Sequence, residues 1–215
     1  MTIADRGEGK RVLAAALGAH VDAPMADLGF TRRAGSLSYR RKVDGGFQRL
    51  VFDFDLHPRY AKDGILVLPY GEVTFPAVLD IARDMWPPSS AAIMDFTLRF
   101  GIEHLSPPSR RTLLVHGPED ADDLARWLAD LVRGRLSTVF EHLSSVPDFV
   151  RWAEGDHDGI PLSTVDWISV AAAQVHIGDP EGALRTLAEH IDLTNPNHQE
   201  FTRAFDHVRS ISSHG

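Results

Sequence analysis

Two short runs of alternating residues, 36–43 and 47–56, are separated by Asp44-Gly45-Gly46 and predict a β-hairpin. Residues two apart share one face of a strand, so the apolar face collects Leu37, Tyr39 and Val43, together with Arg41, and then Leu50, Phe52, Phe54 and Leu56. A turn at Asp44-Gly45 pairs Tyr39 with Leu50, whereas a turn at Gly45-Gly46 pairs Tyr39 with Phe52. Both registers keep the same apolar face, so the sequence predicts the buried side chains but does not decide between the two turns.

The order of the other signals predicts an α+β fold. A helix is expected over residues 8–29, with a kink or end at Pro24 and a stop at Gly29. Strands are expected at 65–75 (broken or at an edge at Pro69), 96–105 and 112–115, and helices at 75–85, 118–144, 147–154, 163–177, 180–191 and from 195.

Helices and strands are therefore segregated along the chain, which is typical of an antiparallel sheet with helices packed against it. We expect an N-terminal helix, an antiparallel sheet of about five strands, a long helix packed on it and an all-helical C-terminal region. This order divides the chain into an α+β domain over residues 1–150 and a C-terminal helical appendage over residues 151–215.

Composition excludes several classes of site and partner. The 215 residues contain no cysteine, which excludes disulfides, thiolate metal ligands and cysteine nucleophiles. The charged N-terminus lacks the apolar run of a signal peptide, and no apolar stretch is long enough to span a bilayer, so we expect a cytoplasmic protein without membrane contact. Residues 31–50 carry a net charge of +5, while the whole chain carries −8. The remaining −13 disfavours nucleic acid and suits a basic partner.

The same order of signals carries a resemblance to a known family. A helix leads into "LGFTRRAGSLSYRR", the strand "FQRLVFDFDL" follows, and a helix with an acidic start is read as "GPEDADDLARWLADLVRGRL". Over about residues 10–154 this resembles a family of uncharacterised bacterial α+β domains, some of whose members lie beside polymorphic toxins as candidate immunity proteins. The glutamine-rich second strand of the family is replaced here by Phe52-Asp53-Phe54-Asp55. The family has no defined catalytic residues, so the resemblance assigns none.

The polar face of the hairpin is the first candidate binding surface. Alternation places Arg40, Lys42 and Arg49 on this face with Asp53 and Phe47. A solvated face with cross-strand ion pairs is the simplest interpretation. Phe47 fits a fully wet face poorly, which leaves room for a protein partner. A platform for single-stranded nucleic acid needs several stacking aromatic residues, and Phe47 alone does not provide one.

Acidic residues and histidines give weaker candidates. Glu119 and Asp120 begin the long helix, where acids are stabilised by the helix dipole and could also attract a basic partner. The loop "GDHDG" at 155–159 fails as a calcium loop, because its twelfth position from Asp156 is Trp167. Three histidines lie near predicted strand ends and could converge: His57, His104 and His116. We therefore predict no catalytic residues, metal ligands or cofactor.

Two functional hypotheses follow from these observations. The first is a non-enzymatic protein-binding domain, with an immunity-like role of neutralising a basic partner as the form implied by the resemblance. The second is a small hydrolase that uses dispersed His and Asp residues. A shallow charged face favours the first, and a polar cleft that holds a histidine within hydrogen-bond reach of a carboxylate favours the second. The sequence predicts no oligomeric state.

Overall fold

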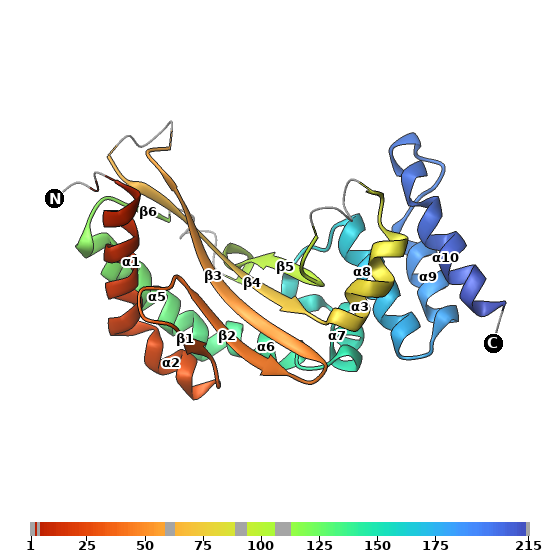
Figure 1. Cartoon of the computed structure of the whole chain (residues 1–215), viewed down its shortest axis with the longest axis horizontal. Coiled ribbons are helices and arrows are strands. Elements are labelled where there is room, and N and C mark those ends of the chain that lie inside the picture. Colours follow the sequence, from red (N-terminus) through yellow and green to blue (C-terminus); the bar gives the residue numbers. More distant parts are fainter. Residues whose placement is uncertain (1–2, 4, 59–62, 89–93, 106–112, 214–215) are drawn as a thin grey trace. The chain divides into compact units, whose positions relative to one another are not determined.

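The computed structural model describes residues 3, 5–58, 63–88, 94–105 and 113–213, and it shows the predicted α+β fold (Figure 1). The sheet contains β1 (Thr31–Arg32), β2 (Ser38–Val43), β3 (Gly46–Leu56), β4 (Ile65–Thr74), β5 (Leu98–Gly101) and β6 (Leu114–Val115). Its strand order is β1-β2-β3-β4-β5, and β6 pairs with β4. The sheet is antiparallel, and β4 continues through Pro69 without a break. Within the residues described here, no helix is both long and apolar enough to span a membrane.

The hairpin takes the first of the two registers that the sequence allowed. A two-residue turn at Asp44-Gly45 joins β2 and β3, and Gly45 has a φ of 71°. The amide of Phe52 donates to the carbonyl of Leu37 at 2.9 Å, which places these two residues opposite each other. Tyr39 therefore lies opposite Leu50. The tyrosine ring also meets the ring of Phe52 edge-on, with centroids 6.2 Å apart.

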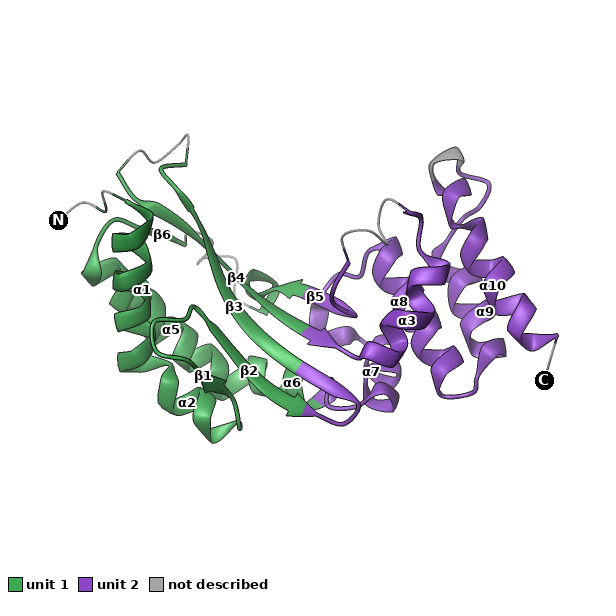
Figure 2. Ribbon diagram, viewed as in Figure 1, with its two compact units in different colours: residues 1–42, 48–72, 100–141 green, residues 43–47, 73–99, 142–215 purple. Residues whose placement is uncertain are grey.

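The chain forms two compact units, each assembled from three separate stretches (Figure 2). Unit 1 comprises residues 1–42, 48–72 and 100–141, and unit 2 comprises residues 43–47, 73–99 and 142–215. The expected appendage, residues 151–215, lies wholly in unit 2. Unit 2 also contains α3 (Pro76–Met85), which precedes the expected boundary at residue 150, and α7 (Val146–Ala153), which crosses it.

In unit 1, α1 (Arg6–His20) packs against α5 (Pro118–Leu131). Their buried side chains line a small gap into which no water fits: Leu13, Ala16, Leu17, Ala121, Leu124, Ala125 and Leu128. The buried face of the hairpin also carries two polar side chains, Arg41 and Gln48. Both donate to the carbonyl of Phe140, at 3.0 and 2.7 Å. Arg41 also donates to the carbonyl of Leu28 at 2.8 Å, so it ties the hairpin to two helix ends.

The expected helix over residues 8–29 is two helices, which corrects that prediction. The first, α1, ends at His20, and the second, α2, runs over Asp22–Asp27. The break falls at Val21, not at Pro24, because proline at the third position of α2 needs no intrahelical N–H partner. Gly29 follows with a φ of 80°, the left-handed conformation that ends a helix.

The long helix expected over residues 118–144 is also interrupted. It begins at Pro118 as predicted, but α5 ends at Leu131 and a π-helical turn follows over Val132–Leu136. Gly134 lies outside helical geometry within that turn, and α6 then runs over Ser137–His142. The expected strand over 96–105 is shorter too, because β5 passes into a 3-10 turn at Ile102.

Unit 2 is mainly helical. A capping box of Ser163 and Asp166 starts α8 (Thr164–His176), which packs against α3, α7 and α9 (Pro180–His190). The chain then forms a 3-10 turn over Pro196–Phe201 and α10 (Thr202–Ser212), which packs against α9 and α3. The side chain of Asp179 caps α9 by accepting from the amide of Gly182 at 2.8 Å.

Candidate functional site

The open face of the sheet in unit 1 is built in rows that cross β2, β3 and β4. We call this surface the open face and define it by Ser38, Arg40, Lys42, Arg49, Val51, Asp53, Leu68, Tyr70 and Glu72. The amide of His57 donates to the carbonyl of Gly64 at 3.0 Å, which fixes the register of β3 against β4. Arg49 then lies opposite Glu72, and Val51 lies opposite Tyr70.

One row combines two cations and one acid. The hairpin register places Arg40 opposite Arg49, and like charges in such a pair are unfavourable. Glu72 offsets this repulsion, because its carboxylate lies 3.1 Å from the Arg49 guanidinium. The Glu72 side chain is only 2% exposed, whereas that of Arg49 is 37% exposed. The row thus contains an ion pair in which the acid, Glu72, is buried and the cation, Arg49, still reaches solvent.

The next row is partly apolar. Val51 and Tyr70 lie opposite each other, and both are half-buried. Leu68, two residues before Tyr70 on β4, is 41% exposed. Large exposed apolar side chains beside charged groups are common at protein interfaces.

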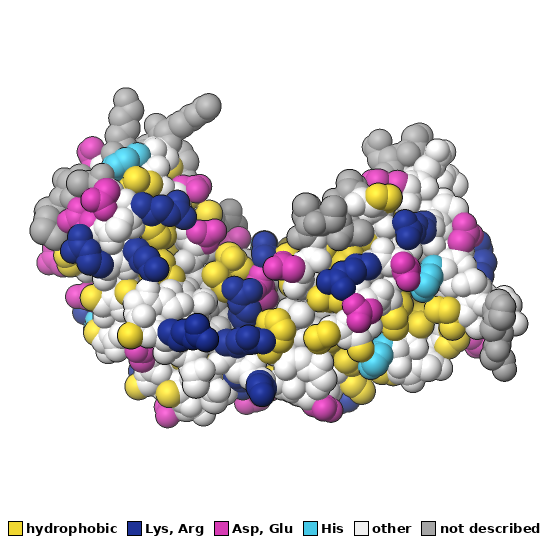
Figure 3. All heavy atoms as spheres, viewed as in Figure 1, with side chains coloured by type: hydrophobic (Ala, Val, Ile, Leu, Met, Phe, Trp, Pro, Cys, Tyr) yellow, Lys and Arg dark blue, Asp and Glu magenta, His cyan; other side chains and the backbone are white. Residues whose placement is uncertain are grey.

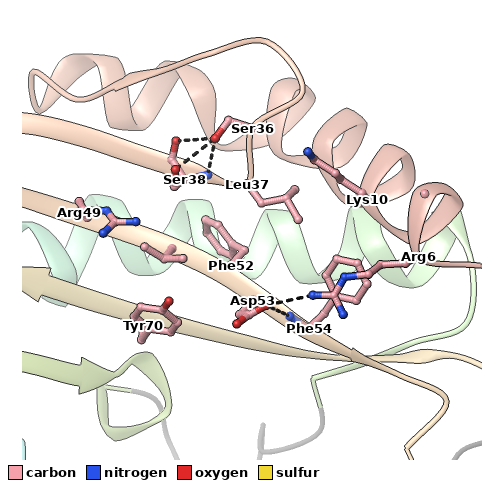
Figure 4. A pocket seen from close by; sticks show the side chains of 12 residues that line it. Arg6, Lys10, Ser36, Leu37, Ser38, Arg49, Phe52, Asp53, Phe54 and Tyr70 are labelled. Atoms are coloured by element: carbon pink, nitrogen blue, oxygen red, sulfur yellow. Dashed lines mark hydrogen bonds and ion pairs between the residues drawn. The ribbon is translucent and has the colours of Figure 1, made fainter. Parts of the chain in front are cut away.

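A hollow of about 510 Å³ lies between this row and the start of α1 (Figure 4). We call it the sheet hollow. Its walls come from α1, from β2 and the segment that precedes it, from β3 and from β4: Arg6, Gly7, Lys10, Ser36, Leu37, Ser38, Arg49, Val51, Phe52, Asp53, Phe54 and Tyr70. Figure 4 shows Lys10 and Arg49 on opposite sides of Phe52, with Arg6 beside Asp53.

Three cations and one acid line the sheet hollow. Arg6 lies 3.6 Å from Asp53 in an exposed ion pair, and its guanidinium sits 4.8 Å from the centre of the Phe54 ring. Lys10, one helical turn after Arg6, is exposed. Basic side chains also gather over β2 and β3 on the face of unit 1 that Figure 3 shows. This arrangement can hold negative charge on a ligand that lies along the sheet.

The sequence candidates are divided among several places. Arg40, Lys42, Arg49 and Asp53 lie on the open face as alternation predicts, and Phe47 is half-buried in unit 2. The two acids at the start of α5, Glu119 and Asp120, do not line the sheet hollow. Asp120 instead accepts a hydrogen bond from the amide of His116 at 2.8 Å, which fixes the entry to α5.

The histidines do not assemble a metal site among the residues that the structure describes. His57 donates its amide to the carbonyl of Gly64, and His116 lies beside the same glycine, so both are at one end of the sheet in unit 1. His104 is exposed in the 3-10 turn after β5. No hydrogen bond among the described residues links these three side chains.

The loop "GDHDG" has a structural role in unit 2. His157 and Asp158 adopt φ values of 40° and 56°, which are strained for residues other than glycine. The carboxylate of Asp158 accepts from the Trp152 indole at 2.8 Å and lies 3.2 Å from His142. The His157 ring lies edge-on to Trp152 and Trp167, each with centroids 6.1 Å apart. These contacts hold the loop against α7 and α8.

Sequence reasoning missed four residues of the site: Arg6, Lys10, Tyr70 and Glu72. The spacing of Arg6 and Lys10 places them on one helix face, but no local signal connects that face to the hairpin. Glu72 was missed because a strand acid usually indicates solvent exposure, and here the acid is buried beside Arg49.

Comparisons with known proteins add no family assignment. No protein-family model matches the chain, and neither a curated protein nor a solved structure was found to be similar to it. The geometry of the site therefore carries the functional argument.

Proposed function

We propose that this chain is a non-enzymatic protein-binding module and that the open face of unit 1 is its binding surface. The observation that carries the proposal is the combination of rows on that face. A half-buried apolar row, Val51 and Tyr70, lies beside a row of two arginines, next to the sheet hollow. Interfaces between proteins combine an apolar centre with a charged rim in this way.

Charge complementarity indicates the chemistry of the contacting segment. The open face presents Arg40, Lys42 and Arg49, and the sheet hollow adds Arg6 and Lys10 from α1. A partner that places acidic side chains over these cations gains both attraction and faster association. The predicted neutralisation of a basic toxin is one form of protein binding. This role stays a prediction. The surface that would contact a basic partner is the first turn of α5, which carries the acids Glu119 and Asp120.

The hydrolase alternative has less support from the geometry. No histidine is among the residues that line the sheet hollow. Close His–carboxylate contacts in the described structure include His142 with Asp158 at 3.2 Å and His20 with Asp122 at 3.4 Å. Both are outside the lining of the hollow, and Asp158 already accepts from the Trp152 indole. We therefore favour binding over acid–base chemistry.

Site-specific photo-crosslinking tests the proposal directly. A benzophenone side chain replaces Leu68 on the open face, and the matched control replaces Ile211 on α10, which has a similar exposure of 38% against 41%. We expect irradiation of native cells to produce one protein adduct from position 68 that position 211 does not produce. The adduct is identified by mass spectrometry, and its protein is purified for binding measurements.

Binding by the purified partner must then depend on the charge of the open face. We expect Lys42→Glu to slow association and weaken binding several-fold at low salt, because it reverses an exposed charge on this face. Arg133→Glu is the control, since Arg133 is an exposed residue with the same charge and lies in the π-helical turn after α5. Equal adducts from both crosslinking positions, or equal effects of the two charge reversals, would contradict the proposal.

A further inference from the structure

We propose that the sheet hollow binds a single carboxylate attached to an apolar group, with the carboxylate at Lys10 and the apolar group against the β3 wall. This inference goes beyond the proposed function, which gives the open face a protein partner and gives the hollow no ligand of its own. It depends on three features of the hollow: its position at the edge of β3, its apolar wall, and the one basic residue that lines it without an ion pair.

The hollow exists because β2 is shorter than β3. The two strands have six and eleven residues, and β2 begins at Ser38, opposite Val51. Phe54 lies beyond this point, and its amide donates to the side chain of Asp53 at 2.9 Å. All four residues of the stretch 51–54 line the hollow. Because consecutive strand residues face opposite sides of a sheet, the hollow lies along the edge of β3 and is not a flat part of one face.

The wall beside β3 is mainly apolar. Phe52 is buried, and Leu37, Val51 and Tyr70 are half-buried, so part of each of these three residues remains in contact with solvent in the hollow. The volume of about 510 Å³ falls within the range of small-ligand pockets, about 300–1,000 Å³. An apolar group placed here removes apolar surface from water on both sides of the contact, which favours binding.

Lys10 is the basic residue of the hollow that can accept a new anion. Of the other two basic lining residues, Arg6 is paired with Asp53 and Arg49 with Glu72. Lys10 is exposed and has no ion-pair partner among the residues that the structure describes. Figure 4 shows its side chain at the rim of the hollow, on the α1 side. A carboxylate at this rim therefore meets an ammonium group that no described acid already holds.

The charges of the hollow favour a ligand with one negative charge. Asp53, the one acid among the described lining residues, is already engaged by Arg6 at 3.6 Å and by the Phe54 amide. A phosphoryl group carries about −1.5 to −2 near neutral pH, which is more than one ammonium group balances, whereas a monocarboxylate matches it. Free small acids with an apolar body share this chemistry with the C-terminal residue of a peptide.

The test titrates the full, ¹⁵N-labelled chain at low salt and follows its amide chemical shifts. The probes are 1-naphthaleneacetate, its uncharged counterpart 1-naphthaleneacetamide, and acetyl-Ala-Ala-Phe, which ends in a free carboxylate. We expect 1-naphthaleneacetate to shift the amides of Gly7, Leu37 and Phe54, and to bind about two- to fivefold more tightly than the amide probe, as for one exposed ion pair. The tighter of the two acidic probes then identifies the source of the carboxylate, and either result supports the site.

Two substitutions separate the charged contact from the apolar contact. Lys10→Gln should abolish the preference for 1-naphthaleneacetate over 1-naphthaleneacetamide and leave the affinity for the amide probe unchanged. Val51→Thr, which keeps the shape of the side chain, should weaken both probes by the same factor, because it changes only the apolar wall. Arg133→Gln, at an exposed residue outside the lining, should change neither affinity. Circular dichroism and thermal unfolding of each variant verify that the fold is retained.

Several results would overturn the inference. These are shifts that map outside the hollow, equal affinity of the wild type for the acid and the amide, and an unchanged preference in Lys10→Gln. Failure of all three probes to bind at millimolar concentration would also overturn it. None of these results decides the proposed function, which depends on the adducts formed from positions 68 and 211.

Discussion

Replacing Asp22 with asparagine should destabilise the protein, because this carboxylate is the common acceptor for two buried donors. It accepts from Arg32 through Nε at 2.7 Å and Nη2 at 2.9 Å, and from the Tyr39 hydroxyl at 2.6 Å. The Arg32 side chain is only 8% exposed, and Tyr39 is buried on the hairpin face. The three residues tie α2, β1 and β2 together within unit 1.

The magnitude follows from burial. Removing one partner from a fully buried ion pair costs about 3–5 kcal/mol. The Asp22 side chain is 44% exposed, so solvent screens part of the lost interaction. Asparagine also keeps one carbonyl oxygen for Arg32 or Tyr39. We therefore expect Asp22→Asn to lower the free energy of unfolding by about 2 kcal/mol near neutral pH.

The effect must also depend on pH with a defined sign. The hydrogen bonds from Arg32, with a further contribution from Tyr39, lower the pKa of Asp22 below its ordinary value of 3.8. A carboxylate with a lowered pKa stabilises the fold above its unfolded pKa, and this contribution is lost as the pH falls through the folded pKa. The difference between wild type and Asp22→Asn should therefore shrink as the pH falls below about 4.

Urea unfolding followed by far-ultraviolet circular dichroism measures both quantities. Tyr39→Phe is the companion variant, with an expected cost of about 1 kcal/mol for one lost hydrogen bond. The double variant should be less destabilised than the sum, because both changes remove the same contact. A cost for Asp22→Asn that is the same near neutral and acidic pH, or full additivity with Tyr39→Phe, would refute the reasoning.

Two further predictions concern other contacts. Gly71→Ala should destabilise the protein by about 1–3 kcal/mol in urea unfolding, because a Cβ at this position would lie 2.3 Å from the Phe100 ring. Gly155→Ala is the control. It should be nearly neutral, since the nearest atom to its Cβ would be 3.4 Å away. Burial lowers the pKa of His190, which stacks on Trp167 with ring centroids 3.4 Å apart. The unfolded state therefore binds more protons than the folded state as the pH drops from about 7 to about 5, so the free energy of unfolding of the wild type should fall more steeply than that of His190→Gln. Urea unfolding at several pH values measures both. Parallel pH profiles would contradict this prediction.

The sequence predicted the faces of the hairpin better than its pairing. Alternation placed Tyr39 and Leu50 inside and Arg40 and Arg49 outside, and the structure shows these positions. The turn could not be chosen, because Asp44-Gly45-Gly46 satisfies two turns and both preserve the faces. The packing of the turn explains the difference between its glycines. Gly45 supplies a left-handed φ, and a Cβ on Gly46 would lie 2.1 Å from the Thr74 carbonyl oxygen.

Helix continuity and site assembly depended on contacts that local patterns do not encode. Periodicity predicted one helix from Pro118, but the π-helical turn around Gly134 interrupts it. Eight of the twelve residues that line the sheet hollow belong to the two hairpin runs, and this part could be anticipated as a charged face. The other four come from α1 (Arg6, Gly7 and Lys10) and from β4 (Tyr70), which are distant in sequence and meet the hairpin only in the fold.

The interleaving of the two units constrains how this protein could have evolved. Each unit draws on three separate stretches of the chain, and β3 and β4 each pass from one unit into the other. A single recombination crossover therefore cannot exchange either unit intact with another gene, and a single cut cannot release one. The two units are expected to be inherited together, so that insertions are tolerated in loops while the order of the stretches stays fixed.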